Sequence, residues 1–279
     1  MQLRVPTALE GFDRHRRRLE AACRAGLDEP NVLGMAITGS FVEGHPDEFS
    51  DLDLRVVLGD GAFRRFFSER GRFLERCGDP VAAFTGEHVG EPNLVITLFD
   101  DLVHVDFLFA EIGEMPERND GRAVRVLWER DPRVGDAFGP PYAPDPRADL
   151  AWLEDRVWTW ACYTQSKILR GELYEALSAL SWMREWVLFR VLAVRSSIRV
   201  RGARFAEDLV GEHGRRIAST VARPDPGSAM DALRTTVDLY VLLADPLLAR
   251  EGVPRSNRAR AVVIHALEAS LDWRPERPS

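Results

Sequence analysis

The pattern of apolar and polar positions changes part-way along the chain. In the first half, short apolar runs alternate with polar turns, a pattern typical of strands. Helical spacing of apolar residues over 8–27 and 61–77 predicts two helices in the same part of the chain. The turn Asp100-Asp101 between the last two runs predicts an antiparallel hairpin. The predicted strands cover residues 31–38, 51–58, 81–85, 93–99 and 103–109.

A boundary follows at residues 131–147, where five prolines and two glycines exclude a helix or a central strand. Beyond it, helical periodicity dominates. We therefore expect an α/β (α+β) protein with a mixed or antiparallel sheet and helices over residues 1–140, followed by an all-α domain over 148–279. The predicted helices of the second domain cover about 148–170, 173–195, 203–221, 228–249 and 255–271.

Composition and charge narrow the class of protein. No apolar run approaches the ~20 residues of a membrane span, and the N-terminus lacks the apolar block of a signal peptide, so we expect a cytoplasmic protein without a membrane partner. Residues 1–150 hold 28 acidic and 18 basic residues, a net charge of −10, whereas the rest holds 16 and 19, or +3. An acidic half attracts metal ions and cationic small molecules. Neither half has the strongly basic surface of a dedicated nucleic-acid binder.

The candidate chemistry is concentrated in one segment and a later strand. Gly39-Ser40 forms a turn whose backbone N–H groups can face a phosphate. Asp51 and Asp53 follow on a predicted strand, where a spacing of two points both carboxylates to one face. Asp106 lies on another predicted strand and can point at the same place. Three carboxylates on adjacent strands form an oxygen cage suited to one or two Mg²⁺ ions.

This pattern resembles the DNA polymerase β-like nucleotidyltransferase superfamily, and the added helical domain most resembles the antibiotic nucleotidyltransferases that modify aminoglycosides or lincosamides. The resemblance implies transfer of a nucleoside monophosphate, AMP from ATP as the leading choice, to a hydroxyl of a small molecule. It implies that Gly39 and Ser40 bind the β- and γ-phosphates and that Asp51 and Asp53 bind two Mg²⁺ ions. Asp106 would be a metal ligand, the general base or both. Glu111 is the alternative base, because some relatives use a glutamate.

Lys167 is the only lysine beside 36 arginines. Relatives often place a lysine from the second domain on the triphosphate, so the resemblance implies that Lys167 binds the nucleotide; a solvated helix lysine is the alternative. Glu172 and Glu175 fit ordinary helix-surface charge, or carboxylates that pair with amines of a cationic acceptor. The tryptophans are expected to be mostly core, with one or two that stack on a sugar or base. They are Trp152, Trp158, Trp160, Trp182 and Trp186.

Other functions remain open. The same chemistry serves antitoxin-like enzymes that modify a protein partner, although these are usually the catalytic domain alone. It also serves enzymes that extend an RNA end, for which a net charge of +3 over the helical domain is weak support. A non-catalytic nucleotide sensor is disfavoured by the complete set of carboxylates. The sequence leaves the acceptor, the nucleotide and the choice between monomer and homodimer undecided.

Overall fold

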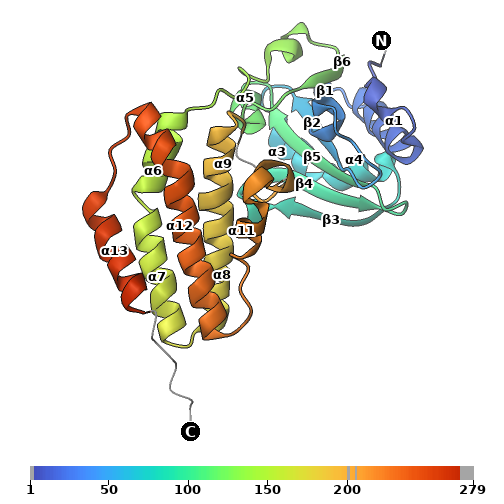
Figure 1. Cartoon of the computed structure of the whole chain (residues 1–279). Helices are drawn as coiled ribbons and strands as arrows, with labels where there is room; N and C mark the ends of the chain where they lie inside the picture. The colour runs from blue at the N-terminus through green and yellow to red at the C-terminus, as the bar shows by residue number, and fades with distance from the viewer. Residues whose placement is uncertain (1–2, 200–201, 205, 271–279) are drawn as a thin grey trace. The chain divides into compact units, whose positions relative to one another are not determined.

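The computed structural model of the chain describes residues 3–199, 202–204 and 206–270. The chain divides into two compact units, Met1–Ala143 and Pro144–Ser279 (Figure 1). Each unit has its own core of buried apolar side chains.

The first unit is built on a six-stranded mixed sheet with the strand order β3-β4-β5-β2-β1-β6. The central pair β2 and β5 is parallel, and all other neighbours are antiparallel, including the predicted hairpin of β4 and β5. All five predicted strands are present, and β6 is an additional one that the apolar pattern did not predict. The strands are β1 Val32–Thr38, β2 Leu52–Leu58, β3 Pro80–Gly86, β4 Glu91–Phe99, β5 His104–Glu111 and β6 Arg125–Glu129.

The helices of the first unit begin and end differently from the prediction. The helix expected over 8–27 begins only at Asp13, because Gly11 adopts a positive φ that interrupts it. The helix expected over 61–77 is divided at Glu69. This break lets Phe66 and Phe73 both pack against Phe109 of the sheet. The helices are α1 Asp13–Leu27, α2 Ser40–Glu43, α3 Phe63–Ser68, α4 Arg70–Cys77 and α5 Met115–Asn119, with 3₁₀ turns at Thr7–Leu9, Glu87–Val89 and Pro132–Asp136.

The two faces of the sheet differ in chemistry because side chains alternate along each strand. On β2, Leu52, Leu54 and Val56 point into a large apolar core that includes residues of α1, α3 and α4. Asp53 and Arg55 lie between them and point to the opposite face. That face is covered in part by α5 and the Pro132–Asp136 turn. Asp53 and Arg55 therefore make this second face the charged face of the central sheet.

The second unit is a bundle in which α7, α12 and a continuous helix made of α8, a π-helical segment and α9 run side by side (Figure 1). Its long helix begins where Asp225 accepts a hydrogen bond from the Ser228 N–H and Pro226 occupies the first turn. The helix predicted over 148–170 is divided at residues 155–156, and the one over 203–221 is two short helices, with Phe205 outside the described residues. The helices are α6 Pro146–Glu154, α7 Val157–Leu169, α8 Leu173–Met183, a π-helical segment Arg184–Phe189, α9 Arg190–Arg195, α10 Ala206–Val210, α11 Gly214–Ala218, α12 Pro226–Glu251 and α13 Asn257–Ala269.

Within the described residues, no helix has both the length and the apolar character that a membrane span requires. The mixed sheet with helices, followed by a helical unit, confirms the predicted α/β (α+β) fold class.

A buried carboxylate joins four elements of the helical unit. Glu154 accepts hydrogen bonds from the Trp158 Nε1–H at 3.0 Å, the Tyr240 hydroxyl at 2.5 Å and the Ser256 backbone N–H at 2.8 Å. Burial, followed by the hydrogen bond to Glu154, raises the pKa of Tyr240, so its proton remains on the phenol oxygen. These bonds connect α6, α7, α12 and the start of α13.

We expect Glu154→Ala to lower the free energy of unfolding by about 3 kcal/mol, because it leaves buried donors without an acceptor. Urea denaturation measures this loss. Glu268→Ala, which removes an exposed carboxylate from α13, should change stability by less than about 0.5 kcal/mol. Equal stability losses in the two variants would contradict the role assigned to Glu154.

Candidate active site

The parallel pairing of β2 with β5 places two carboxylates side by side. In the strand register Asp53 lies opposite Asp106, and on the other side of β2 it lies opposite Thr38 of β1. Asp51 immediately precedes β2. The structure thus brings Asp53 and Asp106, which are far apart in sequence, to one place on the charged face of the sheet. Asp51 enters the same place from the loop before β2.

The turn after β1 is shaped by its contact with Asp53. Gly39 has φ 74° and ψ −156°, a backbone region occupied essentially only by glycine. A Cβ atom at Gly39 would lie 2.2 Å from Asp53 Oδ2, so only a glycine allows this approach. Ser40 begins α2 directly after it. The hydroxyl oxygens of Thr38 and Ser40 are buried and have no hydrogen-bond partner in the described part of the chain. They are polar atoms available to a ligand beside the carboxylates.

Helix α1 contacts the loop that leads into Asp51. His15 is buried and its Nε2 lies 2.8 Å from the Ser50 carbonyl oxygen. The His15 ring also packs against Phe41 of α2, with 5.4 Å between ring centroids. One buried histidine therefore links the loop before Asp51 to the Gly39-Ser40 turn.

The electrostatics of Asp53 favour a nearby cation. Burial raises the pKa of Asp53, and the charge of Asp51 raises it further; the guanidinium groups of Arg55 and Arg122 act in the opposite direction. Arg122 Nη1 lies 3.7 Å from Asp53 Oδ1. A bound cation would relieve the repulsion between the carboxylates, which is the like-charge effect expected of such a cluster.

Arg55 was not singled out from the sequence. It follows Asp53 by two residues on β2, so it points to the same face, and it is only 3% exposed. Burial lowers its pKa to about 10, while Asp53 and Asp106 oppose that change. Its Nε has no hydrogen-bond partner among the residues the structure describes. The alternation of charged and apolar residues in Asp-Leu-Asp-Leu-Arg was a signal that could have identified it. Arg122 lies in a loop and gave no such signal.

Asp106 has a neighbour of its own on β5. His104 Nε2 lies 2.9 Å from Asp106 Oδ1, and this interaction raises the pKa of His104. His104 precedes Asp106 by two residues on β5, so the two side chains share a face and lie in contact.

We expect His104→Asn to destabilise the protein in a pH-dependent way. Because the folded-state pKa is raised, the stabilisation by His104 is fully present below the unfolded-state pKa of about 6.5 and is lost as pH rises through the folded-state value. The His104 side chain is 43% exposed, so the free energies of unfolding of the wild type and the variant should differ by less than about 1 kcal/mol. Urea denaturation at pH 5.5 and pH 9 measures this difference. A difference that is the same at both pH values, or that also occurs for the exposed His88→Asn, would contradict this expectation.

The donor set fits a hard divalent cation, although the side chains are not arranged around one. In the described ranges, no three His, Cys, Asp or Glu side chains converge as ligands of one ion. Asp53 faces Arg122, and Asp106 faces His104. The carboxylates of Asp51, Asp53 and Asp106 are nevertheless the oxygen ligands that Mg²⁺ prefers, and the unpartnered Ser40 hydroxyl lies on the same turn as Gly39.

Two other predicted site residues belong to other parts of the fold. Glu111 is five residues beyond Asp106 on β5, about 17 Å along the strand, and accepts hydrogen bonds from the Gly61 and Phe63 N–H groups. It is therefore occupied in holding the start of α3. Lys167 lies on α7 of the helical unit, where its Nζ is 2.6 Å from Glu172 Oε2. Its predicted role in nucleotide binding stays a prediction.

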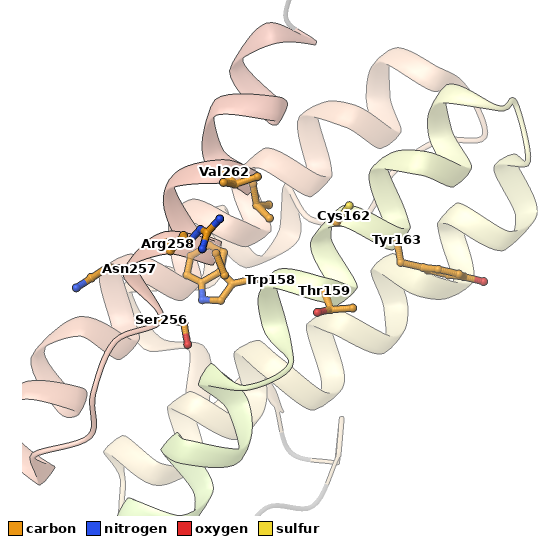
Figure 2. Close-up of a pocket in the computed structure, with 10 residues that line it drawn as sticks. Trp158, Thr159, Cys162, Tyr163, Ser256, Asn257, Arg258 and Val262 are labelled. Atoms are coloured by element: carbon orange, nitrogen blue, oxygen red, sulfur yellow. The ribbon is translucent and has the colours of Figure 1, made fainter.

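The helical unit contains two hollows on either side of α7. One is a groove of about 880 Å³ between α7 and α13, with Trp158 at its base and Cys162 and Val262 on its walls (Figure 2). The other is a hollow of about 480 Å³ between α7 and α8. Tyr163 borders both, and in Figure 2 its ring points away from α13.

Comparison with known proteins gives structural likeness only. No family model and no curated protein matches the sequence. The similar solved structures include the following three. An aminoglycoside 6-adenyltransferase from Bacillus subtilis has 15% identity and a TM-score of 0.40, over 93% of this chain and 98% of the other. A nucleotidyltransferase-like protein from Exiguobacterium sibiricum has 11% identity and a TM-score of 0.37, over 95% and 96%.

The third is a STING-associated c-di-GMP synthase from Capnocytophaga granulosa, with 12% identity and a TM-score of 0.32 over 84% of this chain and 82% of the other. The resemblance is to nucleotidyltransferases. Sequence identity and TM-score are low in all three cases.

Proposed function

We propose that the chain is a Mg²⁺-dependent nucleotidyltransferase that moves a nucleoside monophosphate, AMP from ATP as the leading choice, onto a hydroxyl of a small molecule. The observation that carries the proposal is the register of β2 and β5, which sets Asp53 beside Asp106 directly against Gly39. In-line phosphoryl transfer uses carboxylates that hold metal ions, and here they lie next to a glycine turn whose N–H groups can face a phosphate. The family resemblance of the sequence pattern points to the same reaction.

Each residue of the proposed active site then has a distinct role. Asp51, Asp53 and Asp106 would hold Mg²⁺, which when bound supplies positive charge to the triphosphate. The turn at Gly39 and Ser40 would orient the β- and γ-phosphates through backbone N–H groups and the Ser40 hydroxyl. The acceptor oxygen forms a bond to the α-phosphorus while the bond from that phosphorus to the bridging oxygen breaks, and pyrophosphate leaves. Asp106 accepts the proton of the acceptor hydroxyl; Glu111 is disfavoured because it already holds α3.

An aminoglycoside or a lincosamide is the specific acceptor that we propose, with antibiotic modification as the biological role. The net charge of −10 over residues 1–150 supports a cationic acceptor. We further propose that residues 1–140 form the catalytic domain and that residues 148–279 contribute acceptor and nucleotide binding. Protein modification and RNA-end extension are the alternatives, and an acceptor panel separates them.

The direct test is pyrophosphate release with Mg²⁺ and each of the four nucleoside triphosphates, against aminoglycosides, lincosamides and RNA. We expect release that depends on one small-molecule class and on one nucleotide, and that stops when EDTA removes the metal. Release with RNA alone would replace the small-molecule proposal. Binding of a triphosphate without release for any acceptor would move the proposal to a protein acceptor, and absence of both would contradict the enzyme.

A further inference from the structure

The hollow between α7 and α8 has aromatic walls. Trp160 and Tyr163 of α7 and Trp182 of α8 line it, together with Met183. Trp182 is 47% exposed, which is unusual for the largest apolar side chain. The hollow, about 480 Å³, is large enough for a small organic molecule.

The exposed ring of Trp182 is held in place by its neighbours. It stacks on Trp186 with 5.1 Å between centroids and meets Trp160 edge to face at 6.2 Å. Trp152 contacts Trp160 and Trp186 of the same aromatic cluster. The guanidinium groups of Arg156 and Arg190 lie over its ring, 4.7 Å and 4.2 Å from the centroid. A fixed aromatic face can bind a ligand cation at little cost in side-chain entropy.

One carboxylate borders this aromatic hollow. Glu175 accepts a hydrogen bond from the Tyr163 hydroxyl at 2.5 Å, and it forms no ion pair with any residue that the structure describes. The neighbouring Glu172 differs, because Lys167 lies 2.6 Å from it and Arg170 3.7 Å. Lys167 also lies 5.2 Å from the centre of the Tyr163 ring, but its charge is paired with Glu172. Glu175 is therefore the carboxylate left to pair with a ligand.

We propose that this hollow binds an organic monocation, an amine or quaternary ammonium group on a ring or other apolar body. Trp182, Trp160 and Met183 would contact the body, and Glu175 would pair with the charge. A single unpaired carboxylate matches one positive charge, whereas a polycation would leave further charges without partners. The groove on the other side of α7 is larger, but Arg258 is the charged group of its lining and would repel a cation.

Binding of a monocation in this hollow does not require catalysis. The further claim that the hollow is the acceptor site rests on the proposed function. As an acceptor site, the hollow favours a molecule with one amine on an apolar body, such as a lincosamide, over a polycationic aminoglycoside. The chemistry of the hollow thereby distinguishes lincosamides from aminoglycosides, which the sequence pattern did not separate.

The test is titration calorimetry of the full chain, without nucleotide or Mg²⁺, using benzyltrimethylammonium, lincomycin and kanamycin as probes. Benzyl alcohol is the neutral control. We expect the monocations to bind more tightly than benzyl alcohol and kanamycin. Glu175→Gln should weaken benzyltrimethylammonium by about fivefold, and Trp182→Leu by a similar factor. Glu268→Gln, which changes an exposed carboxylate of α13 that lines neither hollow, should leave binding unchanged.

Equal binding of benzyltrimethylammonium and benzyl alcohol, or unchanged binding in Glu175→Gln, would overturn the proposal. Absence of monocation binding would overturn it too. Each outcome is separate from pyrophosphate release: binding without transfer contradicts the proposed function alone, and transfer without monocation binding contradicts this site alone. Circular dichroism of each variant shows whether the helices remain folded.

Discussion

Replacing Asp53 with Asn should abolish nucleotidyl transfer while the fold persists. The substitution keeps the volume of the side chain but removes a charge from the carboxylate pair that faces the proposed Mg²⁺ site. Loss of several kcal/mol of transition-state stabilisation corresponds to a fall in kcat/KM of about 10² to 10³-fold. Pyrophosphate release, measured with the acceptor identified by the panel, reports the change.

Stability provides the control for this variant. The pKa of Asp53 is raised in the folded state, so its ionised form costs stability as pH rises above the ordinary value for an aspartate. Asp53→Asn should therefore not lower the free energy of unfolding of the metal-free protein at pH 8. Exposed Asp60→Asn supplies a matched substitution away from the site. Transfer at the wild-type rate in Asp53→Asn would contradict the site.

Gly39→Ala is expected to have the second-largest effect. The added Cβ would lie 2.2 Å from Asp53 Oδ2, so either the turn or the carboxylate must move. The backbone at φ 74° and ψ −156° adds strain of about 1–3 kcal/mol for any residue with a Cβ. We expect kcat/KM to fall by about a hundredfold, because a displacement of about 1 Å at reacting groups costs that much.

Gly44→Ala is the control that introduces backbone strain without a steric clash. Gly44 also has a positive φ, 93°, but a Cβ there would meet no atom within 4 Å. Gly44→Ala should therefore lose some stability and keep most of its activity. If both alanine variants lose activity to the same extent, the contact between Gly39 and Asp53 is not what the turn provides. Thermal unfolding of Gly44→Ala measures the backbone strain alone, and that of Gly39→Ala measures the strain together with the collision.

The candidate carboxylates Asp53 and Asp106 could be singled out from the sequence because they lie on predicted strands, where side chains alternate with a period of two. Asp53 and Asp106 each alternate with apolar neighbours, so spacing predicted that each points away from the apolar face of its own strand. The boundary at residues 131–147 was also predictable from the sequence, because its prolines are incompatible with a regular helix or a central strand. Helix boundaries were harder to predict, since a glycine with positive φ at Gly11 and the bend at Glu69 depend on packing.

Sequence by itself determined the mixed class of the fold, five of the strands and the candidate carboxylates, since each depends on local periodicity. Only the tertiary structure decided which strands pair, because register depends on contacts between residues distant in sequence. It set Asp53 beside Asp106 and Gly39, buried Arg55 next to them, and engaged Glu111 in holding α3. It also left Glu175 unpaired in an aromatic hollow while Glu172 pairs with Lys167, a difference that identical side chains cannot reveal in sequence.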